Sequence, residues 1–504
     1  MSSPSTHTNP PSMQRQALSV ITLLADKITP VLAFERLRSL SEYGFLLESS
    51  EQDSRLARFS ILGIGPLDTL TFNNGTVQIA TVSQADNSLE SSCSEECPDP
   101  LKFLQTRSKM YEGKLCQENL PADLPFVAGY VGYLGYGSVA YFDKIPQQKT
   151  DNLNVPDGVF SFYDSLLIFD HKERSLKILS YRGEKHAQSI LDALNNKTDN
   201  RIIIRNAREE GSSQDLSSMN LDIKDAFNGV SMSMTRSDFR TKVEQAKEFV
   251  AQGQVFQIVL AQRFERSYRG DAFKIYRALQ CINPSPYGYF LQFPGFSYLG
   301  ASPERLLQCR SSAISLTALA GTRPRGKNEA EEKELEAELK SNEKELAEHY
   351  MLVDLGRNDL GRVAEIGSVQ CAEIARVTRY GQVMHLSTDI SAKLSSQLSS
   401  FDAVRSCFPA GTVSGAPKIR AMELLAQLEP ERRGIYSGLV GYFDIAGNVD
   451  SAIAIRSALV KDGIIHVSAG AGIVQDSIAE SEYEETRNKA LSVLKAVAIA
   501  DSMQ

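Results

Sequence analysis

The sequence predicts an α+β fold in which stacked antiparallel β-sheets are flanked by helices. Short runs rich in β-branched and aromatic residues, such as 158–170 and 287–293, recur along the chain between glycine-containing turns, which is typical of antiparallel strands. A few longer segments, such as 237–253 and 328–353, have the pattern of helices instead. No repeat of solenoid period is present, so a repetitive array is excluded.

Composition indicates an ordinary soluble protein, with 42% hydrophobic and 23% charged residues in a chain of 504. The net charge of −8 argues against nucleic acid as a partner. No apolar run approaches the roughly 18 residues that a membrane span needs. Seven cysteines show no metal-ligand spacing beyond Cys93 and Cys97 and are interpreted as reduced thiols. Residues 1–16 lack the apolar core of a signal peptide, and we expect them to be a disordered tail of a cytoplasmic protein.

The first region, residues 17–205, begins with a helix expected from Thr29 to about Tyr43, with Thr29 as its N-cap and Pro30 in its first turn. The remaining expected elements are strands within 44–50, 57–72 and 126–182, a polar excursion at 84–98, and a helix at 184–196. Residues 206–232 are rich in Ser, Asn and Asp and are interpreted as a linker.

The second region, residues 233–504, opens with a helix over 237–253 that Gly253 ends. The expected strands are 254–266, 287–293, 297–308, 313–319, 434–444, 451–460 and 463–469, and a charged helix is expected over 328–353.

Two acidic pairs have a spacing that places each on one helix face. Glu482 and Glu485 share a face with Lys489, and Glu345 and Glu348 have the same spacing on the helix upstream. Such a pair usually belongs to a solvated face. If the two helices face each other, however, four carboxylates form an oxygen-rich site suited to a hard ion such as Mg²⁺.

Nine short motifs occur in an order that resembles the anthranilate synthase large subunit, a chorismate-binding enzyme family. The motifs are LLES (46–49), GYVGYLGYG, FQIVLAQRF, NPSPY (283–287), GASPERL (300–306), AGTRPRG (320–326), AEHYMLVDLGRNDLGR, GTVSGAPK (411–418) and GAGIV (470–474). They extend over nearly the whole chain, so chance similarity is excluded.

The resemblance implies a site for chorismate, which carries two carboxylates. Mg²⁺ is expected at Glu348 and Glu485, supported by Glu345 and Glu482, where it neutralises the ring carboxylate. The remaining substrate-binding residues implied by the family are Arg456 and Tyr436 for the other carboxylate, together with Gln257, Gly321, Gly470, Gly472 and Lys489.

The resemblance also implies three catalytic residues, each of which has a plain structural alternative. Glu304 is expected to protonate the departing hydroxyl, although a carboxylate after Pro303 can simply cap a turn. His385 is expected to assist elimination, although a histidine beside Met and Leu is more often part of a core. Thr412 is expected to bind substrate, although its Gly-rich setting is also ordinary turn chemistry.

Two positions distinguish relatives that share the fold. Isochorismate- and salicylate-forming enzymes have a water-activating lysine where this chain has Gln257, and aminodeoxychorismate synthase has a nucleophilic lysine where this chain has Ala320. Both differences favour direct attack by ammonia. Aminodeoxychorismate synthase and a non-catalytic binding module that keeps the fold remain the alternatives.

The family further implies a regulator and a partner. Glu48, Ser49, Pro286 and Tyr287 are expected to bind L-tryptophan as an inhibitor, with Gly288 standing where many relatives have Met. Glutamine hydrolysis needs a Gly-x-Cys-x-Gly elbow, which no cysteine here occupies, Cys407 included. Ammonia is therefore expected from a glutamine amidotransferase small subunit, in a heterotetramer of two large and two small subunits.

Overall fold

The structure is a computed structural model that describes residues 17–49, 58–82, 89–115, 124–146, 150–195, 223–379 and 383–503. The expected tail, 1–16, and residues 206–222 of the expected linker lie outside this range. Within it, no helix is long and apolar enough to cross a membrane.

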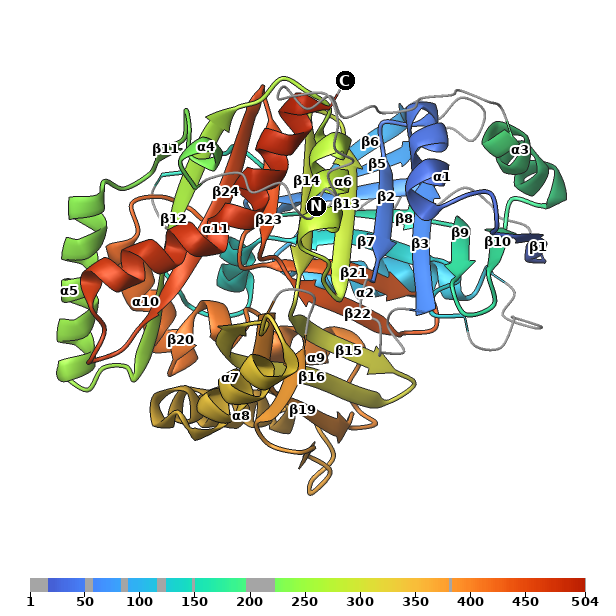
Figure 1. Cartoon of the computed structure of the whole chain (residues 1–504). Helices are drawn as coiled ribbons and strands as arrows, with labels where there is room; N and C mark the ends of the chain where they lie inside the picture. The colour runs from blue at the N-terminus through green and yellow to red at the C-terminus, as the bar shows by residue number, and fades with distance from the viewer. Residues whose placement is uncertain are drawn as a thin grey trace, which may run out of the picture.

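Two large antiparallel sheets form the centre of the molecule, as the sequence predicts (Figure 1). Over the described residues the first has 12 strands, in the spatial order β1 (Ser19–Leu24), β10 (Ser175–Ser180), β9 (Ser165–Asp170), β3 (Phe59–Ile64), β2 (Gly44–Glu48), β13 (Tyr287–Phe293), β14 (Phe296–Ser302), β23 (Ser457–Lys461), β24 (Ile464–Ile473), β12 (Gln257–Ser267) and β11 (Ser231–Met232), with β20 (Gly415–Ala416) paired to β12.

The second sheet also has 12 strands within the described ranges. Their order is β17 (Gln370–Cys371), β19 (Val383–Lys393), β16 (Ala313–Pro324), β15 (Arg305–Arg310), β22 (Val449–Ile453), β21 (Leu439–Asp444), β7 (Gly129–Leu134), β8 (Gly158–Tyr163), β4 (Asp68–Asn73), β5 (Thr76–Val82) and β6 (Leu89–Glu96), with β18 (Arg376–Arg379) paired to β19.

Helices cover the outer faces of the sheets. They are α1 (Pro30–Leu37), α2 (Pro100–Glu112), α3 (Glu184–Asn195), α4 (Ile223–Ala226), α5 (Arg236–Ala251), α6 (Ala272–Ile282), α7 (Glu329–Ser341), α8 (Glu343–Gly361), α9 (Ser400–Cys407), α10 (Lys418–Leu428) and α11 (Ala479–Ser502). Figure 1 shows α1, α6 and α11 on the first sheet and α7 and α8 beside β16 and β19.

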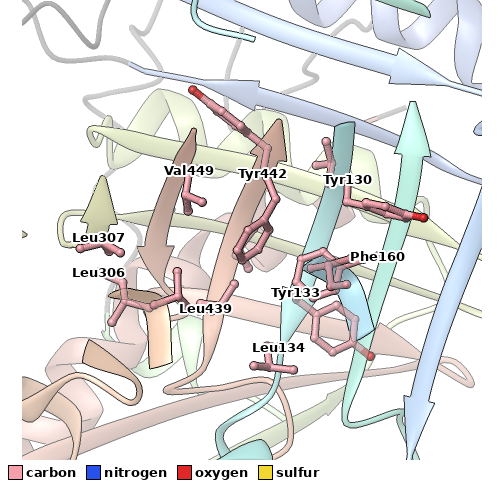
Figure 2. Packing of buried hydrophobic residues seen from close by; sticks show 14 of the residues in the cluster. Tyr130, Tyr133, Leu134, Phe160, Leu306, Leu307, Leu439, Tyr442 and Val449 are labelled. Atoms are coloured by element: carbon pink, nitrogen blue, oxygen red, sulfur yellow. The ribbon is translucent and has the colours of Figure 1, made fainter. Parts of the chain in front are cut away.

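The main core lies between the two sheets. It combines side chains of the first sheet, such as Tyr289 and Tyr298, with side chains of the second. Figure 2 shows part of the second sheet's contribution, in which Tyr133, Phe160 and Leu439 come from neighbouring strands. A separate cluster packs α1, α6 and α11 against the first sheet. Both faces of the central part of the first sheet are therefore buried, which explains why the strands there are almost wholly apolar, whereas residues of the edge strands β1 and β11 are partly exposed.

The two sequence regions do not have separate sheets. In the first sheet β2 of the first region pairs with β13 of the second, and in the second sheet β7 pairs with β21. Residues 223–232, which the sequence places in the linker, contain α4 and the short strand β11 paired to β12.

Thr29 caps α1 as expected, with its hydroxyl accepting a hydrogen bond from Leu32 N at 3.2 Å. The expected helix over 328–353 is in fact two helices, because Asn342 accepts from Glu345 N and starts α8 anew. The polar segment 84–98 was expected to be an excursion, which is wrong for β6, because its backbone pairs with β5 at the sheet edge despite its polar side chains.

Two expected strands are each divided between the sheets. The segment 297–308 is β14 in the first sheet and β15 in the second, and 451–460 is β22 in the second sheet and β23 in the first. In both cases apolar residues flank the crossing, and polar residues, Glu304 in the first and Arg456 in the second, mark the point at which the chain crosses over. These two crossings are central to the candidate site.

Candidate active site

Glu304 and Arg456 stand at the two points where the chain crosses between the sheets. The crossings are adjacent, because Ala301 N donates to the carbonyl of Arg456 at 3.1 Å and Ile453 N donates to the carbonyl of Glu304 at 3.0 Å. Arg456 has a φ of 51°, a left-handed conformation that a non-glycine residue rarely adopts. Such strain is typical of functional positions, where the surrounding structure holds it in place.

The Glu304 carboxylate does not cap a turn. It accepts a hydrogen bond from the Thr412 hydroxyl at 2.8 Å, across from the short helical turn Gly411–Val413. Burial raises the pKa of Glu304, with a further contribution from Glu348, while Thr412, Lys489 and Arg456 oppose the rise. A rise in pKa favours the protonated form of this carboxyl group, which is the form that a general acid uses.

The Arg456 guanidinium lacks a carboxylate partner among the described residues. It donates a hydrogen bond to the main-chain oxygen of Lys489, at 2.9 Å. Burial lowers its pKa, opposed by Tyr436, Glu304 and Glu485. A buried cation is costly without an anion, so this arginine favours an anionic ligand.

His385 lies on β19 beside Gly321, which interrupts the register between β16 and β19. Gly321 has a φ of 61°, and its carbonyl oxygen lies 2.8 Å from His385 Nδ1. The Thr322 hydroxyl also lies 3.0 Å from Nδ1, but the shorter contact is with a carbonyl, which only accepts, so we assign the proton to Nδ1 and the lone pair to Nε2. Burial, together with the charges of Arg456 and Lys489, lowers the pKa of His385 to about 4. The imidazole is therefore neutral and able to accept a proton at Nε2.

Glycines form one wall of the site on β24. A Cβ atom at Gly472 would lie 2.4 Å from the Gln257 amide nitrogen, and one at Gly470 would lie 3.3 Å from the Tyr436 hydroxyl. The Lys489 ammonium donates to the Gly470 carbonyl at 3.0 Å. Side chains at 470 and 472 would fill the space that these polar groups face.

The four predicted carboxylates lie on α8 and α11. Three of them have polar partners: Glu348 accepts from Gln257 at 2.8 Å, Glu485 lies 2.7 Å from Lys489, and Glu345 lies 3.0 Å from Arg323. Burial raises the pKa of Glu348, and the charges of Glu345 and Glu485 add to the rise. Burial also raises the pKa of Glu482, with Glu485 contributing. The helices thus bring the acidic pairs within electrostatic reach of one another.

These carboxylates do not form a complete metal cage. Over the described residues no three His, Cys, Asp or Glu side chains are close enough to hold a metal ion by themselves. Mg²⁺ in enzymes is often held by one or two carboxylates, with waters and substrate oxygens as the other ligands. Glu348 and Glu485, which repel each other, fit that limited donor set.

His349, which follows Glu348, belongs to the core. It is fully buried, and its Nε2 lies 2.7 Å from the Thr388 hydroxyl. Burial lowers its pKa to about 4, so this residue is a neutral packing group.

Glu48, Ser49, Pro286 and Tyr287 all line a second cavity, together with Gly288. Burial raises the pKa of Glu48, which accepts a hydrogen bond from Tyr276 at 2.6 Å. The buried Ser49 hydroxyl has no hydrogen-bond partner within the described part of the chain. The cavity therefore offers an acidic group and a hydroxyl to a ligand.

The sequence interpretation did not identify two arginines near the site. Arg323 pairs with Glu345, and Arg433 lies below Tyr436 in a buried ion pair with Glu429. Arg323 lies within the motif AGTRPRG, whereas Arg433 directly precedes the expected strand 434–444 and no motif marks it.

Comparison with known proteins agrees with this geometry. The family of chorismate binding enzymes matches residues 44–495. Anthranilate synthase component 1 of Geobacillus stearothermophilus is 38% identical over 487 residues, which cover 95% of this chain and 93% of the relative. The Acetivibrio thermocellus protein of the same name is 39% identical over 479 residues, covering 94% and 93%.

Solved structures give the same result. Anthranilate synthase component I from Streptococcus pneumoniae TIGR4 superposes with a TM-score of 0.73 at 34% identity, covering 94% of this chain and 99% of that one. A menaquinone-specific isochorismate synthase from Escherichia coli has a TM-score of 0.67 at 18% identity, covering 96% and 95%, and supports the fold alone. The chain therefore belongs to the chorismate binding enzyme family and, within it, to the anthranilate synthase component 1 proteins.

Proposed function

We propose that the chain converts chorismate and ammonia into anthranilate and pyruvate in the cytoplasm, as the first committed step of tryptophan biosynthesis. The observation that carries this proposal is the pairing of the two crossings. They place a carboxyl group of raised pKa, Glu304, beside a guanidinium without a carboxylate partner in the described structure, Arg456.

Substrate binding rests on groups that face the glycine wall. A guanidinium matches a carboxylate with two parallel hydrogen bonds, so Arg456 is suited to one carboxylate of chorismate, with the Tyr436 hydroxyl as a further donor. Lys489, which lies near both Glu304 and Glu348, contributes a second positive charge. These groups orient the ring in the site.

Glu304 serves as the acid in the first step. As ammonia forms a bond to C2, the bond from C4 to its hydroxyl breaks, and the proton from Glu304 lets that hydroxyl leave as water. The Thr412 hydroxyl, which donates to one carboxyl oxygen, leaves the other oxygen to carry the transferable proton.

His385 is suited to the second step, in which loss of the C2 proton and release of the enolpyruvyl group as pyruvate make the ring aromatic. The hydrogen bond from Nδ1 to Gly321 fixes the tautomer that has a basic Nε2. The low pKa of His385, about 4, keeps that nitrogen unprotonated at neutral pH.

Two neighbouring groups favour ammonia over other nucleophiles. The Gln257 amide donates to Glu348 and cannot remove a proton from water. Ala320, on β16, presents only a methyl group where a lysine would be able to attack C2.

Mg²⁺ would be held by Glu348 and Glu485, with Glu345 and Glu482 in support. When bound, the ion would neutralise the ring carboxylate of chorismate and orient it. Burial raises the pKa of Glu348, and the charges of Glu345 and Glu485 add to the rise, so a cation at this place would stabilise the ionised carboxylates.

Regulation by L-tryptophan is proposed at the second cavity. The ammonium group of L-tryptophan can donate a hydrogen bond to Glu48, and its indole ring can contact Tyr287 and Pro286. Ammonia is proposed to come from a glutamine amidotransferase small subunit, two copies of which would join two copies of this chain.

The test is formation of fluorescent anthranilate by the purified chain from chorismate, ammonium chloride and Mg²⁺. Anthranilate with equimolar pyruvate is the expected product, and Arg456→Gln should lower kcat/KM by about 100-fold or more. Accumulation of aminodeoxychorismate, or no turnover by folded protein, would favour one of the two alternatives instead.

A further inference from the structure

Arg433 uses every donor of its guanidinium inside the protein. Nε donates to Glu429 at 2.9 Å, one terminal nitrogen donates to the Val413 carbonyl at 2.6 Å and to the Ser437 hydroxyl at 3.1 Å, and the other donates to the Val259 carbonyl at 2.7 Å and to Glu429. An arginine has five N–H donors, so none remains for a ligand.

The same side chain is packed between aromatic rings. Its guanidinium carbon lies 4.5 Å from the centre of the Tyr136 ring and 5.9 Å from that of Tyr436. Its ion-pair partner, Glu429, also accepts from Ala261 N at 3.0 Å. Both side chains of the pair are only 3% exposed. The buried pair therefore holds β12, the 411–413 turn and the segment before β21 together.

Each segment that Arg433 holds carries a residue of the candidate site. Val259 follows Gln257 by two residues on β12, Val413 follows Thr412, and Ser437 follows Tyr436. Ser437 has a φ of 67°, so its backbone is strained, and the hydrogen bond from Arg433 helps to hold it.

Arg433 and Arg456 therefore differ in how far their hydrogen-bond donors are used within the protein. The Arg456 guanidinium donates to a main-chain oxygen and has no carboxylate partner among the described residues, which suits it to a ligand. Arg433 is saturated, so any influence on the reaction must pass through the residues that it holds.

We propose that Arg433, with Glu429, is a positioning residue that sets the relative placement of Tyr436, Thr412 and Gln257 around chorismate. The inference rests on the proposed function, since those three residues act there. Displacement of a reacting group by about 1 Å can cost about 100-fold in rate, so loss of the Arg433 contacts should affect both binding and chemistry.

The first test is Ser437→Gly. Glycine tolerates a positive φ, so the backbone loses no stability, but the acceptor for Arg433 is removed. We expect about a tenfold loss in kcat/KM with a raised KM for chorismate and an unchanged melting temperature. An unchanged KM and kcat would overturn the proposal.

The second test is Arg433→Lys, which keeps the charge but not the fork of donors. We expect kcat/KM to fall by about 100-fold, through both a lower kcat and a higher KM. If Arg433 served stability alone, kcat would fall in proportion to the folded fraction and KM would stay unchanged. Arg432→Lys is the matched control, because Arg432 is 30% exposed, and it should keep wild-type kinetics. If the Arg433→Lys variant does not fold, the kinetics of Ser437→Gly alone test the proposal.

A rescue experiment separates position from charge. Arg433 also lines a cavity of about 690 Å³, which leaves room for a small cation beside residue 433. Millimolar guanidinium should restore activity to Arg433→Ala by about tenfold, and methylammonium should not. Equal effects of the two cations would contradict the proposal. Wild-type turnover in the same assay tests the proposed function separately. Failure of the proposed function is therefore distinguishable from failure of the positioning role of Arg433.

Discussion

At the scale of single residues, His385 shows how the site selects a protonation state. Its Nδ1 faces a carbonyl, and Arg456 and Lys489 add positive charge nearby, so the imidazolium form is disfavoured. Since burial lowers its pKa to about 4, the unfolded chain binds more protons than the folded protein between about pH 4 and 6.5. His385 therefore contributes stability that is lost as pH falls through this range.

We predict that His385 remains neutral down to about pH 5. An NMR titration of histidine Cε1–H signals, with His385→Asn to assign the resonance, should show no midpoint above pH 5 for this residue. A midpoint near 6.5 would mean that the ring is solvated and that the assigned tautomer is wrong.

Glu304, by contrast, shows what the sequence leaves undetermined. Its motif indicates a role, but a carboxylate after proline is also ordinary turn chemistry, and only the contact with Thr412, 108 residues away, separates the two. Long-range contacts of this kind depend on topology, which local patterns do not specify.

At the scale of elements, sequence patterns predict most strands and helices but not where the chain changes sheets. The runs 297–308 and 451–460 have buried apolar residues on both sides of each crossing, interrupted only briefly at Pro303–Arg305 and at Arg456. Periodicity cannot distinguish one long strand from two strands in different sheets. The expectation that α8 and α11 bring their acidic faces together depended likewise on packing, and the electrostatic coupling of Glu348 with Glu485 supports it.

The helix pair gives a prediction about metal. Glu348→Ala or Glu485→Ala should reduce turnover by about 100-fold or more, because a charge-neutralising ion is lost from the substrate site. Mg²⁺ should raise the melting temperature of the wild type and not that of Glu348→Ala. Glu343→Ala, also on α8, is the control and should keep both properties. Near-wild-type turnover of either variant in EDTA would refute the assignment.

The strands β2 and β13 give a prediction about regulation. Ser49 ends the segment that lines the second cavity, so Ser49→Phe should fill space that a ligand needs. We expect L-tryptophan to inhibit the wild type at micromolar to millimolar concentrations and the variant far more weakly, with basal kcat/KM unchanged. Wild-type enzyme that is insensitive to millimolar tryptophan would disprove this role for the cavity.

At the scale of the whole molecule, both sheets combine strands of residues 17–205 with strands of 233–504, and the main core takes side chains from both. The two regions should therefore unfold together. A fragment covering 233–504 should fail to give a cooperative transition in urea, monitored by circular dichroism and tyrosine fluorescence, while the full chain gives one. A fragment with its own sharp transition would show that the regions are independent domains.

The central claim is that this chain catalyses amination of chorismate directly with ammonia, and the nitrogen source tests it most directly. Purified chain should convert chorismate with ¹⁵N-ammonium and Mg²⁺ into ¹⁵N-anthranilate and equimolar pyruvate, measured by mass spectrometry. With glutamine as the sole nitrogen source it should form none until a glutamine amidotransferase subunit is added. Isochorismate or aminodeoxychorismate as the final product, or substantial turnover of glutamine by the chain alone, would contradict the account.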